Sequence, residues 1–260
     1  MDGFPLRTRF KDDIVTEFLP PLHPSNKVII FANGAPGYPN VSKHFLDYLA
    51  RLGYWTFIPR YRGTWESDGY FMERPLDEDI LDVVSGLEES FIDFWSGGSF
   101  KVHNPEVYLI GGSTGGAGVI LASRDPRVRK AVALSPVVDW RKQEETAEPL
   151  NLMSEYIPKA FGQGYRAKQD AWKKLAAGGF YNPIEVKDEI DGSKLMITHG
   201  THDFVVHYPP AEEFAREVGA RFLPLPYKGH MGAGSVRNPR IWKHVYRFLR
   251  DLPPPRWYHF

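Results

Sequence analysis

The sequence contains no cysteine among its 260 residues. This absence excludes disulfide bonds, thiolate metal sites and a cysteine nucleophile, and it agrees with a reducing compartment. An excess of one charge sign is lacking too, because Lys plus Arg and Asp plus Glu each number 32. A chain with balanced charge lacks the basic surface typical of nucleic-acid-binding proteins, so we expect no nucleic-acid partner.

Long apolar runs are also missing, and none reaches the length needed to cross a membrane. The segment from Met1 to Phe10 lacks the basic-then-apolar order of a secretory signal. We therefore predict a cytoplasmic protein without a membrane span. A length of 260 residues is near the upper limit for one hydrophobic core, which predicts a single domain over residues 1–260. The oligomeric state, monomer or homodimer, is not determined by these features.

Short apolar runs alternate with segments of helical periodicity, which is typical of parallel βαβ units. The near-continuous hydrophobicity of these runs suits strands that are covered by helices on both faces. The predicted strands are Lys27–Ala32, Tyr54–Ile58, Glu106–Ile110, Lys130–Leu134, Lys194–Thr198 and Arg221–Leu225. The expected fold class is therefore α/β, with a mostly parallel central sheet.

Helices and a hairpin accompany these strands. Apolar residues at helical spacing predict crossover helices over 41–52 and 76–94. Two short segments, 4–10 and 13–19, predict an antiparallel hairpin ahead of the parallel sheet.

The stretch from about residue 140 to 190 has no evident strand, carries many charges and is interrupted at Pro149 and Gly162. We interpret it as a small helical insertion or cap. Two roles are possible for these helices: they cover an edge of the sheet, or they gate a pocket.

A glycine-rich turn follows the predicted strand that ends at Ile110. Its sequence, Gly-Gly-Ser-Thr-Gly-Gly over 111–116, places Ser113 between a buried strand and a segment of small residues. Such a turn holds a serine in strained dihedral angles, and Gly111 and Gly115 supply the necessary room. The turn lacks both the ending of a phosphate-binding P-loop and the spacing of a dinucleotide-binding loop. We predict Ser113 as a nucleophile; the alternative is a tight turn without chemistry.

A serine hydroxyl needs a histidine to take its proton and an acid to orient that histidine. Asp203 ends the segment His-Gly-Thr-His-Asp that follows a predicted strand, and His230 lies in a glycine-flanked loop after the last one. The chain order Ser, Asp, His is that of the α/β-hydrolase fold. We predict His230 as the base and Asp203 as the acid, with Asp139, which also follows a strand, as the competing acid.

Acyl transfer also requires donors for the developing oxyanion, and backbone N–H groups are the usual source. One expected donor is Thr114, directly after the nucleophile. The other is Ala35, in the loop Asn-Gly-Ala-Pro-Gly that follows the first parallel strand. An ordinary proline-glycine turn is the alternative interpretation of this loop.

These segments together resemble the α/β-hydrolase superfamily, and within it the single-domain serine esterases related to the prolyl oligopeptidase family. The resemblance covers nearly the whole chain and is carried by residues 60–69, 111–116 and 199–203. It implies the α/β-hydrolase fold and hydrolysis of small carboxylic esters through an acyl-enzyme, with no metal or organic cofactor. Relatives usually carry His in place of Asn33 and Tyr or Gln in place of Thr114.

Other functions stay open beside the carboxylesterase interpretation: a small aminopeptidase or acyl-peptidase-like hydrolase, and a non-catalytic binding module on the same fold. The expected partner is a small-molecule ester. Loops beside the predicted catalytic groups carry large side chains that are candidates for the substrate pocket. These candidates are Tyr38, Trp65, Trp140, Val206 and Met231.

Overall fold

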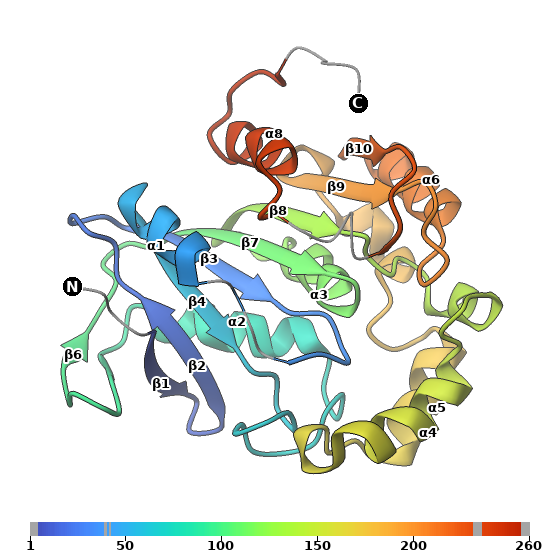
Figure 1. Cartoon of the computed structure of the whole chain (residues 1–260), viewed down its shortest axis with the longest axis horizontal. Helices are drawn as coiled ribbons and strands as arrows, with labels where there is room; N and C mark the ends of the chain where they lie inside the picture. The colour runs from blue at the N-terminus through green and yellow to red at the C-terminus, as the bar shows by residue number, and fades with distance from the viewer. Residues whose placement is uncertain (1–4, 39–40, 42, 231–235, 256–260) are drawn as a thin grey trace.

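The computed structural model describes residues 5–38, 41, 43–230 and 236–255. Its centre is an eight-stranded sheet with the strand order β1-β2-β4-β3-β7-β8-β9-β10 (Figure 1). The strands are β1 Leu6–Phe10, β2 Ile14–Leu19, β3 Lys27–Ala32, β4 Tyr54–Pro59, β7 Glu106–Gly112, β8 Val128–Leu134, β9 Leu195–Gly200 and β10 Arg221–Leu225. β2 is antiparallel to both β1 and β4, and the pairs from β4 through β10 are parallel, which confirms the predicted mixed sheet.

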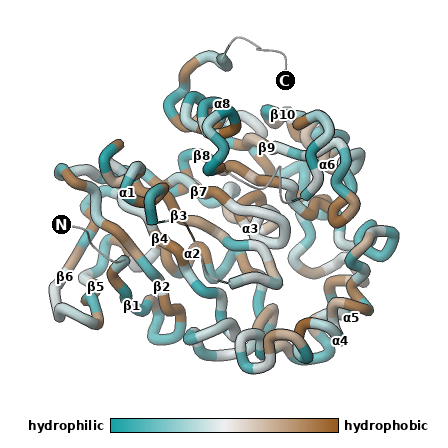
Figure 2. Tube along the Cα trace, in the orientation of Figure 1, coloured by the Kyte–Doolittle hydropathy of each residue, from teal (hydrophilic) through white to brown (hydrophobic). Residues whose placement is uncertain are grey.

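Helices cover both faces of this sheet, because successive strand residues point to opposite sides. In β3, Val28 and Ile30 belong to one buried cluster, whereas Ile29 and Phe31 belong to another. Figure 2 shows the resulting hydrophobic centre of the sheet. One face carries α1 (Lys43–Arg51) and α8 (Pro239–Leu249); the other carries α2 (Leu76–Gly86), α3 (Thr114–Ala122) and α6 (Tyr208–Val218).

The predicted helix over 76–94 is wrong in its second half. α2 ends at Gly86, and Phe91 lies instead in the short strand β5 (Phe91–Ile92), which pairs with β6 (Ser99–Phe100). The ring of Phe91 packs against Phe10 and Phe18, with centroid distances of 5.4 and 5.2 Å. Tertiary contacts with the N-terminal hairpin therefore outweigh the helical spacing of the apolar residues.

The segment between β8 and β9 is helical, as predicted. It consists of η1 Trp140–Glu145, α4 Leu150–Phe161, η2 Gly162–Gly164, α5 Gln169–Ala177, η3 Pro183–Glu189 and η4 Gly192–Lys194. Figure 1 shows α4 and α5 beyond the arrowheads of β3 and β4, at the carboxyl edge of the sheet. Isolated bridges from Thr64 to Tyr165 and from Phe71 to Ala167 fasten this segment to the loop after β4. Within the described residues, no helix is both long and apolar enough to cross a membrane.

Candidate active site

Ser113 lies at the tight turn between β7 and α3, with φ 53° and ψ −121°. This left-handed conformation is strained for a residue with a side chain, and it persists only where the surroundings enforce it. The surroundings are crowded: a methyl group on Gly111 would collide with the carbonyl oxygen of Gly115, and one on Gly115 with that of Ala32. The glycines of the motif thus allow the serine to stand at the carboxyl edge of the sheet.

The loop after β3 approaches this serine closely. A Cβ atom on Gly34 would lie 3.1 Å from the Cβ atom of Ser113, so glycine permits the approach. The next residue, Ala35, accepts a hydrogen bond at its carbonyl oxygen from the Thr114 hydroxyl, at 3.2 Å. In the described part of the chain, neither Ala35 N–H nor Thr114 N–H donates to a protein acceptor. Both groups are therefore available to a ligand oxygen.

Four aromatic side chains brace the backbone around these N–H groups. The Tyr61 hydroxyl donates to the Asn33 carbonyl at 2.9 Å, and the Tyr181 hydroxyl donates to the Thr114 carbonyl at 2.7 Å. The Gly37 carbonyl accepts from the Tyr165 hydroxyl at 3.1 Å and from the Trp65 indole at 3.2 Å. Because Tyr165 and Tyr181 lie between β8 and β9, the insertion helps to fix both the loop after β3 and the start of α3.

Asp203 follows β9 and is buried, with 4% of its surface exposed. One carboxylate oxygen accepts from the backbone N–H groups of Val205 and Val206, at 3.0 and 2.9 Å. The other oxygen lies 2.8 Å from Nδ1 of His230. The backbone bonds thus orient the carboxylate so that its second oxygen faces the imidazole.

Burial by itself would raise the pKa of the Asp203 carboxyl. Hydrogen bonds from His199, His230 and the Val206 N–H outweigh this effect and hold the pKa well below its usual range. The carboxylate is therefore ionised at neutral pH and accepts a hydrogen bond from Nδ1–H of His230. This bond selects the tautomer whose Nε2 carries a free lone pair, as a general base requires.

His199, on β9, also contacts the Asp203 carboxylate. Its ring is fully buried, with Nε2 2.9 Å from the Val206 carbonyl oxygen and 3.4 Å from Asp203. The loop that carries His230 is tied to the loop that carries Asp203, because the His202 N–H donates to the Lys228 carbonyl at 3.0 Å. The competing acid, Asp139, caps η1 instead and accepts from the Arg141 guanidinium at 2.9 Å.

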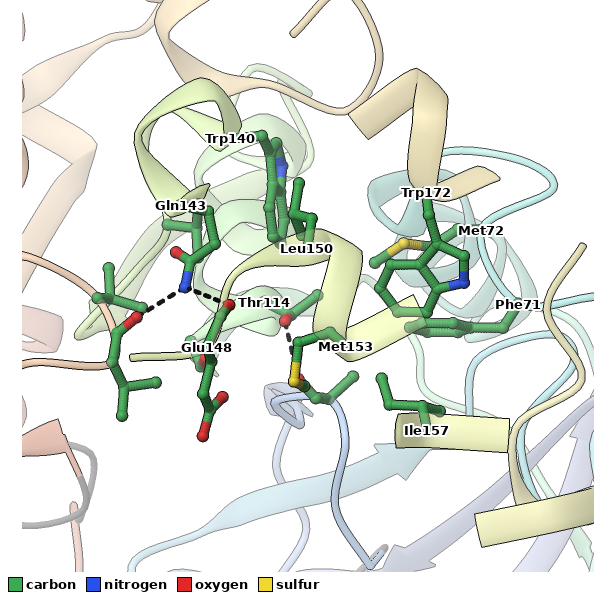
Figure 3. A pocket seen from close by; sticks show the side chains of 15 residues that line it. Phe71, Met72, Thr114, Trp140, Gln143, Glu148, Leu150, Met153, Ile157 and Trp172 are labelled. Carbon is green, nitrogen blue, oxygen red and sulfur yellow. Dashed lines mark hydrogen bonds between the residues drawn. The ribbon is translucent and has the colours of Figure 1, made fainter. Parts of the chain in front are cut away.

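Two cavities meet at Ser113 and Ala35. The wide cavity, of about 440 Å³, is lined by His230 and by residues of the loop after β3 and of α4. The narrow cavity, of about 30 Å³, is mostly apolar (Figure 3). Its apolar walls are Phe71, Met72, Val137, Trp140, Leu150, Met153, Ile157, Trp172, Val205 and Val206.

The predicted pocket residues are distributed unevenly over these cavities. Tyr38 lines the wide cavity, and Trp140 and Val206 line the narrow one. Trp65 lines neither of the two and packs behind Tyr38, with a ring-centroid distance of 5.1 Å. Met231 lies outside the described residues.

Sequence reasoning missed the contribution of α4 to the site. Leu150, Met153 and Ile157 point from this helix into the narrow cavity, as Figure 3 shows. Their i, i+3, i+7 spacing is a sequence signal for an apolar helix face. The spacing does not reveal what that face covers, because the position of α4 over the sheet edge depends on long-range contacts.

A serine at a strand-to-helix turn and a buried aspartate–histidine pair at the same sheet edge define the class: the protein is a serine hydrolase with the α/β-hydrolase fold. The sequence model of the Prolyl oligopeptidase family matches residues 39–252. The match spans most of the chain, which therefore belongs to the prolyl oligopeptidase family.

Solved structures share this fold. DcsB, solved with a substrate analogue, has a TM-score of 0.71 and 17% identity, over 95% of this chain and 98% of that one. An esterase from Pyrococcus furiosus has a TM-score of 0.67 and 16% identity, over 96% and 91% of the chains. An acylaminoacyl peptidase from Pyrococcus horikoshii has a TM-score of 0.64 and 15% identity, over 95% of this chain and 41% of that one. No curated protein matches the sequence.

Proposed function

We propose that this protein hydrolyses small carboxylic esters through an acyl-enzyme formed on Ser113. The observation that carries the proposal is that Ser113 and His230 line one cavity while His230 Nδ1 lies 2.8 Å from the ionised Asp203. Ionised Asp203 keeps Nε2 of His230 free to accept the serine proton. Ser135 also lines this cavity, but of the two serines only Ser113 stands at a turn that leads from a strand directly into a helix.

In the proposed reaction, His230 Nε2 takes the proton from Ser113 Oγ as the oxygen attacks the ester carbonyl. The resulting oxyanion accepts hydrogen bonds from the N–H groups of Ala35 and Thr114, each worth roughly 3–4 kcal/mol of transition-state stabilisation. Protonated His230 then gives its proton to the departing alkoxide. Water, deprotonated by the same imidazole, attacks the acyl-enzyme and releases the acid.

The two cavities suggest which part of the ester goes where. The proton donor to the leaving alcohol is His230, which lines the wide cavity and not the narrow one. The alcohol must therefore depart on the wide side. The acyl group then occupies the narrow apolar cavity beside Thr114. The small volume of this cavity, about 30 Å³, favours short acyl chains over acyl-peptides.

The chain-length preference is expected to change when the narrow cavity is enlarged. The p-nitrophenyl acetate and propionate esters should be the best substrates of the wild type, and Ile157→Ala should move the optimum to longer acyl chains. Ile157 is 1% exposed and lines only the narrow of the two cavities, so its loss creates room there. The measurement is kcat/KM over a series of acyl lengths.

Leu152→Ala is the matched control for this series, because Leu152 lies on the same helix but is 59% exposed. It should leave the profile unchanged. If Ile157→Ala folds, as judged by its thermal unfolding, and still shows the wild-type profile, the acyl group does not occupy the narrow cavity.

Covalent labelling tests the proposed function directly. A fluorophosphonate probe should modify the protein with a stoichiometry of one, and peptide mass spectrometry should locate the adduct on Ser113. An ester and an arylamide with the same acyl group then separate the candidate activities: faster ester hydrolysis supports the proposal, whereas faster arylamide hydrolysis indicates a peptidase. A protein that is neither labelled nor active is a binding module.

A further inference from the structure

A carboxylate without a partner stands where the two cavities meet. Glu148, just before α4, lines both the narrow and the wide cavity. Its side chain is exposed and makes no hydrogen bond or ion pair within the described part of the chain. In Figure 3 the dashed line near Glu148 reaches its backbone oxygen, whereas the carboxylate extends away from the apolar cluster without a contact.

The backbone under this carboxylate is held in place by a buried glutamine. Gln143 Nε2 donates to the Glu148 carbonyl at 3.2 Å and to the Val205 carbonyl at 2.7 Å. The Ala147 N–H also donates to the Phe204 carbonyl at 2.8 Å. The backbone of Glu148 is thereby tied to the loop that orients Asp203, which keeps this residue beside the reacting groups.

The charge of the two cavities is of one sign. The sequence has 32 Lys and Arg residues, and none of those that the structure describes lines either cavity. Glu148 is the one carboxylate among their described lining residues, and the one basic side chain is His230. A substrate group of positive charge is therefore attracted to this mouth, and a negative one is repelled.

Aromatic faces accompany the carboxylate. Tyr38, Tyr156 and Phe161 line the wide cavity, with centroid distances of 5.8 Å from Tyr38 to Phe161 and 6.3 Å from Tyr156 to Phe161. Tyr38 is 72% exposed and Tyr156 is 54% exposed, so their faces are open to a ligand. Aromatic faces attract organic cations through the ring quadrupole, and combined with a carboxylate they suit an alkylammonium group.

We propose that the preferred substrates are esters whose leaving alcohol carries an amine or a quaternary ammonium group, held by Glu148 and the aromatic side chains of the wide cavity. The inference rests on the proposed function, since the wide cavity is the side on which His230 releases the alcohol. A neutral aryl alcohol would contact the aromatic side chains but would not gain from the negative charge of Glu148.

A pair of thioesters of equal shape tests this inference. Acetylthiocholine and its neutral analogue, the thioacetate of 3,3-dimethylbutane-1-thiol, differ at one atom. The first has a positively charged quaternary nitrogen where the second has a neutral quaternary carbon. Thiol release is followed with a disulfide reagent, which the protein does not consume because it has no cysteine. The wild type should prefer the cationic thioester by about fivefold or more in kcat/KM, the size expected for a partly exposed charge pair with an aromatic contribution.

Glu148→Gln should weaken this preference by lowering kcat/KM for acetylthiocholine about threefold, with less than a twofold change for the neutral thioester, because the aromatic contribution remains. Glu145→Gln is the matched control, because Glu145 is exposed on the same segment and lines neither cavity. A wild-type ratio near one, or equal losses for both thioesters in Glu148→Gln, would overturn the inference.

Binding separates failure of this inference from failure of the proposed hydrolysis. Calorimetry with Ser113→Ala measures the affinity for each thioester without turnover. Tighter binding of acetylthiocholine that is weakened in Ser113→Ala/Glu148→Gln supports the cation site even if the wild type hydrolyses neither compound. Equal affinity for the two thioesters, or none for either, refutes the cation site even if both are hydrolysed.

Discussion

Replacing Ser113 by alanine is expected to lower kcat for p-nitrophenyl acetate by about 10⁶-fold, the size of loss recorded when other serine hydrolases lose their nucleophile. The variant keeps the backbone N–H groups of Ala35 and Thr114 but has no oxygen to form the acyl-enzyme. The strained dihedral angles at this position suit alanine no worse than serine, so folding should be preserved. The measurement is the rate of nitrophenol release, together with the intact mass of the wild type during turnover.

The intact mass should reveal an acetyl adduct on the wild type and none on the variant. Ser154→Ala is the control, because Ser154 is a half-buried residue of α4 that lines neither cavity, and its hydroxyl donates to the Asn151 carbonyl of the same helix. If Ser113→Ala retains more than a tenth of the wild-type rate, the nucleophile is a different group.

Replacing Asp203 by asparagine should lower kcat by about 10⁴-fold with little change in KM. The side-chain oxygen of asparagine can still accept from the N–H groups of Val205 and Val206, so the loop should keep its shape. The amide nitrogen would then face Nδ1 of His230 and donate to it. The proton of His230 moves to Nε2, where a lone pair is needed to accept the serine proton.

Asp139→Asn is the matched control, because Asp139 also follows a strand and is also hydrogen-bonded, but to Arg141 and Asn182. It should keep kcat within a few-fold of the wild type. The acid is misassigned if Asp139→Asn is the variant that loses activity and Asp203→Asn is not.

Asp203→Asn should also change how stability depends on pH. The wild-type pKa of Asp203 lies below that of an unfolded aspartate, about 3.9. Its stabilising contribution is therefore complete above that pH and is lost as the pH falls toward the folded-state pKa. Denaturant unfolding between pH 3 and pH 7 should show a weaker loss of stability on acidification in the variant than in the wild type.

The sequence alone predicted much of the sheet, because burial on both faces imposes near-continuous apolar runs. The predicted strands Lys27–Ala32 and Arg221–Leu225 match β3 and β10 to the residue. Ser113 was also evident, since a strained turn between a strand and a helix tolerates only tiny neighbours. The apolar runs and the glycine-rich turn are local signals, because each is recognisable within a short stretch of sequence.

Other features depended on contacts between segments far apart in the sequence. The helix over 76–94 was predicted too long, because the packing of Phe91 on the N-terminal hairpin is invisible to local periodicity. Asp203 and Asp139 look alike in sequence, and only the fold brings one of them to His230.

The sequence by itself determined the fold class and the turn that presents Ser113, because backbone strain and strand burial depend on residues that are close together in the sequence. Tertiary structure alone decided the shape and charge of the cavities. In the sequence, nothing distinguishes Glu148 and Ile157 from other residues of a helical segment. They line a cavity only because α4 lies at the carboxyl edge of the sheet. That position is fixed by packing and by hydrogen bonds between distant loops, for which no short sequence pattern exists.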